Sequence, residues 1–135
     1  MKFLFLFFSK ILYTPIIPNY LNFHHIALFQ KTPFNKTEYN DVYGVDFCPC
    51  GSLVEVISGK KLQGKVRLFH IDKCDANDIY KIILLQEISE YRNVEILNKI
   101  KRIDKNLYDR IQSWEPVFQL YGRNCQDFVK YILFL

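Results

Sequence analysis

The order of sequence patterns along the chain predicts an α+β domain in which an antiparallel sheet packs against helices. Apolar and aromatic alternation dominates the first half, whereas apolar residues recur at helical spacing in the second half. This segregated order is typical of α+β folds. The 135 residues, half of them apolar and 16% aromatic, suffice for one domain with a hydrophobic core. We expect an apolar N-terminal segment over residues 1–20 and a single domain over 21–135.

Three stretches have the properties of strands. Residues 23–29, 41–47 and 65–71 are rich in apolar and aromatic side chains, and turn-forming residues bound them. Residues 53–57 are interpreted as a further short strand. Because alternate side chains of a strand share a face, His24 and His25 should point to opposite faces of the sheet. Adjacent histidines placed in this way form a poor metal-binding pair.

The second half of the chain is predicted to be mainly helical. Residues 79–88 are ambiguous, because Asp75 or Asn77 would cap a helix while strand-forming residues follow; we interpret them as a strand. A stripe of apolar residues from Val94 to Ile103 predicts a helix that faces the core. Residues 106–113 form a second helical stretch, and a last helix is expected to begin at Cys125.

Charge and cysteine content argue against several classes of function. The formal net charge is +4, and the basic residues are spread along the chain without a cluster, so we expect no nucleic-acid partner. The four cysteines are too sparse for a disulfide scaffold, which suggests a reduced, cytoplasmic or membrane-associated protein. The pair Cys48 and Cys50 lacks a second, matching pair, so we predict no metal site and no cofactor.

The N-terminal segment was checked for a targeting or membrane role. Lys2 precedes six apolar residues, but Lys10 interrupts the run, and no stretch approaches the ~20 residues that span a membrane. We therefore expect a buried or edge element of the domain. The first alternative is weak contact of residues 1–12 with a membrane surface, and the second is a cleaved signal peptide.

The sequence around Cys125 is typical of an activated cysteine. Asn124 is a favourable N-cap residue, so Cys125 should lie in the first turn of the last helix. Unpaired backbone N–H groups and the positive end of the helix dipole favour a thiolate there. A histidine is the usual base for such a nucleophile, because its pKa lies near neutral pH. The other interpretation is a buried, inert cysteine at a helix start.

These residues resemble a known superfamily. The strand His25-Ile26-Ala27-Leu28-Phe29, followed much later by Asn124-Cys125-Gln126-Asp127-Phe128 at a helix start, is similar to the circularly permuted papain-like cysteine hydrolases. That group includes the lecithin:retinol acyltransferase family within the NlpC superfamily. The segment from Tyr43 to Pro49 also resembles a strand motif of several bacterial relatives. The resemblance implies an NlpC-type, permuted papain-like fold.

The resemblance also implies roles for individual residues. Cys125 would be the nucleophile and His25 the base. At the helix start formed by Asn124, Cys125 and Gln126, the backbone N–H groups of Cys125 and Gln126 are expected to help stabilise an oxyanion, as helix N-termini do elsewhere. The acyltransferases carry a second histidine on the next strand, but this chain has no histidine between His25 and His70. Asp46 is our candidate for the orienting residue, with Tyr43 as the alternative.

The implied chemistry is acyl transfer through a thioester. The substrate would be a peptide, an amide or a lipid ester, and the acceptor decides between a thiol hydrolase and an acyltransferase. The alternative function is a catalytically inactive papain-like module that contacts a protein partner or a membrane surface.

Overall fold

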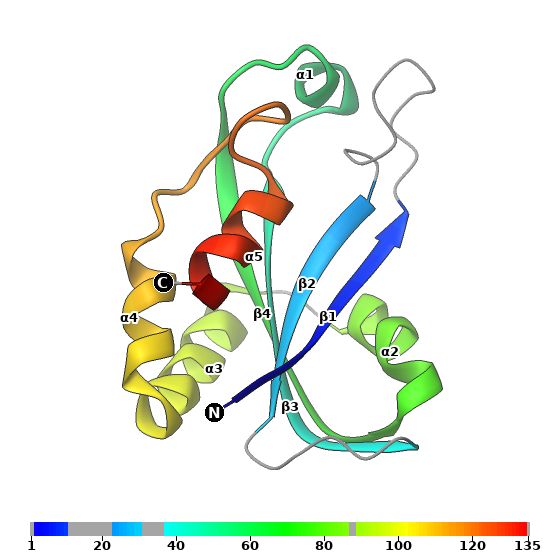
Figure 1. Cartoon of the computed structure of the whole chain (residues 1–135). Helices are drawn as coiled ribbons and strands as arrows, with labels where there is room; N and C mark the ends of the chain where they lie inside the picture. Colours follow the sequence, from blue (N-terminus) through cyan, green and yellow to red (C-terminus); the bar gives the residue numbers. More distant parts are fainter. Residues whose placement is uncertain (1, 11–22, 31–36, 87–88, 135) are drawn as a thin grey trace.

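The computed structural model of the chain describes residues 2–10, 23–30, 37–86 and 89–134, and it confirms the α+β class (Figure 1). The strands are antiparallel and lie across the sheet in chain order: β1 (Lys2–Lys10), β2 (Phe23–Gln30), β3 (Glu38–Pro49), β4 (Leu62–Asp75) and the two-residue β5 (Val117–Phe118). The helices are α1 (Leu53–Ile57), α2 (Ile79–Leu85), α3 (Glu90–Ile103), α4 (Lys105–Ser113) and α5 (Cys125–Phe134). A short 3-10 turn over Ala76–Asp78 leads into α2.

The sheet is buried on both faces, and each face has its own hydrophobic cluster. Ala27 and Phe29 of β2 belong to the cluster that also contains residues of α3, α4 and α5. Ile26 and Leu28 belong to the second cluster, which contains Ile79 and other residues of α2. Figure 1 shows the same arrangement, with α3, α4 and α5 on one side of the sheet and α2 on the other. The alternation predicted for residues 26–29 is therefore confirmed.

The N-terminal segment forms the edge of the sheet, as predicted. β1 pairs with β2 from Lys2 opposite Gln30 to Lys10 opposite Phe23. The side chains of β1 and residues 11–22 lie outside the described part of the structure, so the contact of residues 1–12 with a membrane stays a prediction. None of the described helices has the length and apolar content needed to cross a membrane.

Two predicted strands are helices in the structure. Residues 53–57 form α1, because Ser52 and Glu55 make a capping box: the Glu55 backbone N–H donates to Ser52 Oγ and the Ser52 N–H to Glu55 Oε1. Residues 79–85 form α2 rather than a strand. Ile79 and Ile83 are both buried, at the four-residue spacing of a helix, so packing against the sheet outweighs the strand propensity of the segment.

The other predicted helices are confirmed, with one correction to their core-facing residues. α3 begins at Glu90, a few residues before the predicted stripe. α4 begins at Lys105, next to its predicted start, and α5 begins at Cys125 as predicted. Ile96 and Ile100 of the predicted stripe are buried. Val94 was wrongly included in that stripe, since it is 55% exposed. It lies one turn after the start of α3, beside Asn93, which is the residue that faces β4 there.

The outer edge of β4 is closed by polar side chains as well as by a strand. Beyond the short pairing with β5, the Gly64 N–H donates to the Pro116 carbonyl. Farther along the same edge, Asn93 of α3 accepts a hydrogen bond from the Leu68 N–H and donates one to the Val66 carbonyl. Gln86 then donates to the His70 carbonyl. The edge is thereby protected from pairing with another chain.

The two halves of the sheet separate at the end where α5 begins. β2 and β3 pair only from Ala27 to Gln30, opposite Val42 to Val45. Beyond Ala27, β2 continues with β1, and beyond Val45, β3 continues with β4. Figure 1 shows β1 and β2 diverging from β3 and β4. Backbone groups of β2 that would otherwise pair with β3 are thus available to α5.

Candidate functional site

The start of α5 is fixed by a reciprocal cap. The side-chain oxygen of Asn124 accepts hydrogen bonds from the backbone N–H groups of Gln126 (3.0 Å) and Asp127 (3.1 Å). Asp127 accepts in return from the Asn124 N–H, and the Asn124 amide nitrogen donates to the Leu120 carbonyl. This confirms Asn124 as the cap and places Cys125 as the first residue of the helix. The Gln126 N–H, predicted as an oxyanion donor, is engaged with Asn124 Oδ1.

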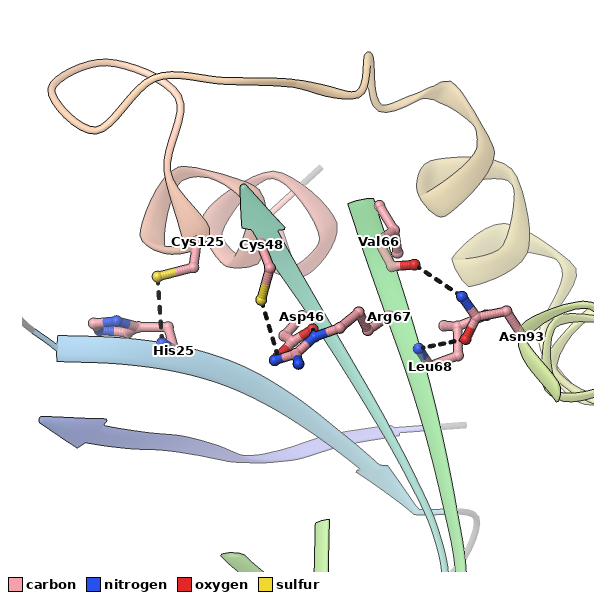
Figure 2. Close-up of polar contacts among 8 residues, drawn as sticks. All are labelled: His25, Asp46, Cys48, Val66, Arg67, Leu68, Asn93 and Cys125. Carbon is pink, nitrogen blue, oxygen red and sulfur yellow. Dashed lines mark hydrogen bonds and ion pairs between the residues drawn. The ribbon is translucent and has the colours of Figure 1, made fainter. Parts of the chain in front are cut away.

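Cys125 and His25, 100 residues apart in the sequence, are in direct contact. The backbone N–H of His25 donates a hydrogen bond to the Cys125 sulfur at 3.4 Å (Figure 2). This contact forms where β2 has separated from β3. Cys125 is 8% exposed and His25 is partly buried, so the contact is largely shielded from solvent. The structure therefore brings together the two residues that sequence analysis selected as nucleophile and base.

The environment of the sulfur favours its negatively charged form in two ways. A backbone N–H donates to it, and hydrogen bonds to a charged form stabilise that form. The sulfur also lies at the N-terminus of a ten-residue helix, where the helix dipole favours an anion. The hydrogen bond between the two residues comes from the backbone N–H of His25. Figure 2 shows the imidazole ring extending to one side of this hydrogen bond.

Asp46, the predicted orienting residue, is fully buried and forms a two-point ion pair with Arg67. Arg67 Nε lies 2.9 Å from Asp46 Oδ1, and Arg67 Nη2 lies 2.5 Å from Asp46 Oδ2. The two residues are directly opposite each other on β3 and β4. The Cys48 thiol also approaches Asp46 Oδ2, at 3.8 Å. The pairing gives a buried carboxylate the partner that it needs.

The sheet geometry separates Asp46 from the predicted base. Asp46 is four residues after Val42, which belongs to the α2 cluster, so both side chains share that face of β3. His25 is two residues before Ala27, which belongs to the cluster on the opposite face. In Figure 2 the His25 ring extends away from the Asp46 side chain. The orienting role predicted for Asp46 therefore gains no support from the fold.

The alternative orienting residue, Tyr43, is also engaged elsewhere. Its ring is buried and stacks on the ring of His70, with 4.5 Å between centroids and 22° between planes. The side chain of His24 is not among those that the structure describes, so its predicted orientation stays a prediction.

A surface cavity of about 440 Å³ lies between the edge of β4 and helices α3 and α4. Lys65 and Val66 of β4, Leu97 of α3 and Trp114 are among its lining residues, and Lys65 forms an ion pair with Glu90 across 3.2 Å. Neither Cys125 nor His25 is among the described residues that line it. The cavity is thus a separate feature from the Cys125 contact.

Two polar residues with contacts across the sheet edge, Arg67 and Asn93, were not predicted from the sequence. Arg67 was noted only as part of a strand, and its pairing with Asp46 depends on a strand register that no local pattern reveals. Asn93 was expected at the start of a helix, but its contacts with β4 join segments 25 residues apart. By contrast, the capping-box pattern of Ser52 and Glu55 is visible in the sequence and could have predicted α1.

No family model, no curated protein and no solved structure matches this chain.

Proposed function

We propose that the chain is a papain-like thiol hydrolase or acyltransferase with a permuted, NlpC-type arrangement, in which Cys125 is the nucleophile and His25 the base. The observation that carries the proposal is the 3.4 Å contact between the Cys125 sulfur and the His25 backbone. It joins a histidine-bearing strand to a cysteine at a helix start, in the order expected for the permuted group. The proposed chemistry uses the Cys125 thiol as nucleophile and the His25 imidazole as base.

In the proposed reaction, the His25 imidazole takes the proton from the Cys125 thiol. The thiolate forms a C–S bond with the carbonyl carbon of an ester or amide, and the carbonyl electrons move to oxygen. Collapse of this intermediate breaks the C–O or C–N bond, and the imidazolium protonates the leaving group. Water or an amine then attacks the thioester and releases Cys125. The Gln126 N–H already donates to Asn124 Oδ1. An oxyanion would have to displace that oxygen before it could accept a hydrogen bond from Gln126.

Labelling with iodoacetamide tests the activated cysteine, and the chain supplies its own reference thiol. Cys50 is free and exposed, so it serves as the reference thiol. Model-peptide cysteine has a pKa of ~8.5 and is mostly protonated at about pH 6, so an activated Cys125 should react faster than Cys50 at that pH despite its burial. Mass spectrometry of the labelled peptides measures both rates in one sample.

The variant His25→Ala separates the ring from the backbone. It removes the imidazole but keeps the N–H that contacts the sulfur, so we expect the rate at Cys125 to fall while the rate at Cys50 stays the same. Labelling of Cys125 no faster than Cys50 in the wild-type chain would contradict an activated nucleophile.

The second candidate is a papain-like module without catalysis that contacts a protein partner or a membrane surface. Exposed apolar side chains favour it: Leu53 and Val54 of α1 are 52% and 77% exposed, and Tyr121 is 55% exposed. Tyr121 lies close to the end of α1. Its ring packs against Gly59, two residues after the helix, so closely that a Cβ atom at Gly59 would lie 2.9 Å from the ring. An unreactive Cys125 would favour this function over the enzyme.

A further inference from the structure

Three ligand-type side chains meet on β3 and β4, outside the Cys125 site. His70 Nε2 lies 2.5 Å from Asp41 Oδ1 and 3.8 Å from Asp72 Oδ1, and the three ligand atoms all lie within 4.8 Å of one another. His70 is largely buried, whereas the side chains of Asp41 and Asp72 are 55% and 96% exposed. Sequence analysis assigned no function to these residues.

The strand register sets two negative charges against each other. Asn40 pairs with Lys73 and Val42 pairs with Ile71, which places Asp41 opposite Asp72. Like charges in directly opposite positions destabilise a strand pair. A cation held between the two carboxylates would convert this repulsion into attraction.

The backbone and the neighbours hold His70 and Asp41 in place for such a cation. Asp41 has a φ of 51°, a left-handed conformation that aspartate adopts more readily than most residues. The imidazole of His70 is stacked on the buried ring of Tyr43, which fixes its plane.

We propose that Asp41, His70 and Asp72 bind a divalent first-row metal ion such as Mn²⁺ or Zn²⁺, through one imidazole nitrogen and two carboxylate oxygens. An ion about 2.1 Å from each ligand atom separates neighbouring ligands by roughly 3.0–3.4 Å. The observed distances of 2.5 and 3.8 Å lie on either side of this range. The Asp41 and Asp72 side chains are exposed and therefore free of packing that would prevent their rotation toward it. Water completes the coordination.

The nitrogen ligand selects among metal ions. Imidazole suits Zn²⁺ better than Mg²⁺ or Ca²⁺, which prefer oxygen ligands alone, and the two carboxylates suit Mn²⁺. The inference stands apart from the proposed chemistry of Cys125, so either one can fail without the other.

The test is titration of the full chain with Mn²⁺. Electron paramagnetic resonance measures the concentration of free Mn²⁺ at each step. Mn²⁺ is chosen because thiolates are poor ligands for it, so Cys48 and Cys50 do not compete. Asp72→Asn replaces a charged carboxylate ligand with a neutral amide, and because the Asp72 side chain is 96% exposed the fold should be unaffected. Asp41→Asn is a second variant, since asparagine tolerates the left-handed backbone equally well. Asp109→Asn, an exposed position on α4, makes the same change of charge elsewhere.

We expect the wild-type chain and Asp109→Asn to bind a single Mn²⁺ that Zn²⁺ displaces, and both ligand variants to bind it roughly tenfold or more weakly. Free Mn²⁺ in the presence of wild-type chain at millimolar concentration would overturn the proposal, and so would binding by Asp72→Asn equal to that of wild type.

Discussion

Asn124 performs two tasks at the start of α5. Its side-chain oxygen satisfies two backbone N–H groups of the first turn, and its amide nitrogen ties the helix to the Leu120 carbonyl. The place of Cys125 in the first turn of the helix is thereby set by local hydrogen bonds. This part of the candidate site could be predicted from sequence, because a cap acts on residues within three positions of itself.

Glu55 offers a pH-dependent test of a local interaction. Its pKa is lowered from the ordinary value of 4.5, first by the Ser52 backbone N–H and then by the Ser52 hydroxyl, both of which donate to the carboxylate. A lowered pKa in the folded state means that the interaction stabilises α1 above the ordinary pKa and is lost as the pH falls through the lowered one. Titration of Glu55 by NMR should give a midpoint below 4.5.

The variant Ser52→Ala is the control for this titration. It keeps the backbone donor and removes the hydroxyl, so the pKa of Glu55 should rise part of the way back. A midpoint at or above 4.5 in the wild-type chain would show that the capping box does not form.

At the scale of elements, α2 shows why a local pattern can mislead. Its sequence is rich in strand-forming isoleucine, yet Ile79 and Ile83 pack as one helical face on the sheet. A strand would have turned successive residues to opposite faces, and only one of those faces has a sheet to cover. The choice between helix and strand was made by the packing surface that β3 and β4 provide.

Asn93 connects α3 to the edge of β4, and its removal should cost stability. Asn93→Ala leaves the Val66 carbonyl and the Leu68 N–H without their partner in a largely buried position. We expect the free energy of unfolding to fall by about 2–3 kcal/mol, given ~1–3 kcal/mol for a buried polar group left unsatisfied. Urea denaturation measures the change.

Asn98→Ala is the matched control on the same helix. Asn98 is exposed, and the change of helix propensity is the same at both positions. Its effect should stay within about 0.5 kcal/mol. Equal effects of the two variants would mean that the Asn93 contacts contribute nothing to stability.

At the scale of the whole molecule, an aromatic cluster joins α5 to the sheet and to the segment after α4. The Phe128 ring lies 5.7 Å from the Phe47 ring of β3 and 5.3 Å from that of Trp114. Phe128 is fully buried. Because it follows Cys125 by three residues in the same helix, the packing that anchors Phe128 also sets where the Cys125 sulfur meets β2.

The variant Phe128→Ala tests this anchor. Loss of a buried phenylalanine should lower the free energy of unfolding by about 3–5 kcal/mol, a large part of the roughly 5–15 kcal/mol of a typical domain. Tyr91→Ala removes an aromatic side chain that is 80% exposed and should change stability by less than about 0.5 kcal/mol. Urea denaturation compares the two, and a loss below about 1 kcal/mol for Phe128→Ala would contradict the role of the cluster.

The features that depend on near neighbours could be predicted from the sequence. The strand that carries His25, the cap at Asn124 and the helix start at Cys125 all follow from patterns a few residues long. Hydrophobic periodicity also identified β2 and α3, because the buried face of an element repeats along its own sequence.

Which distant residues meet depends on the packing of the whole fold. The register of β3 and β4 pairs Asp46 with Arg67 and sets Asp41 against Asp72, and the separation of β2 from β3 admits Cys125 to the His25 backbone. Each of these contacts joins segments that no local pattern relates. The physical reason is that register and sheet curvature depend on the packing of the whole core, so polar partners across the sheet are fixed only when the core is complete.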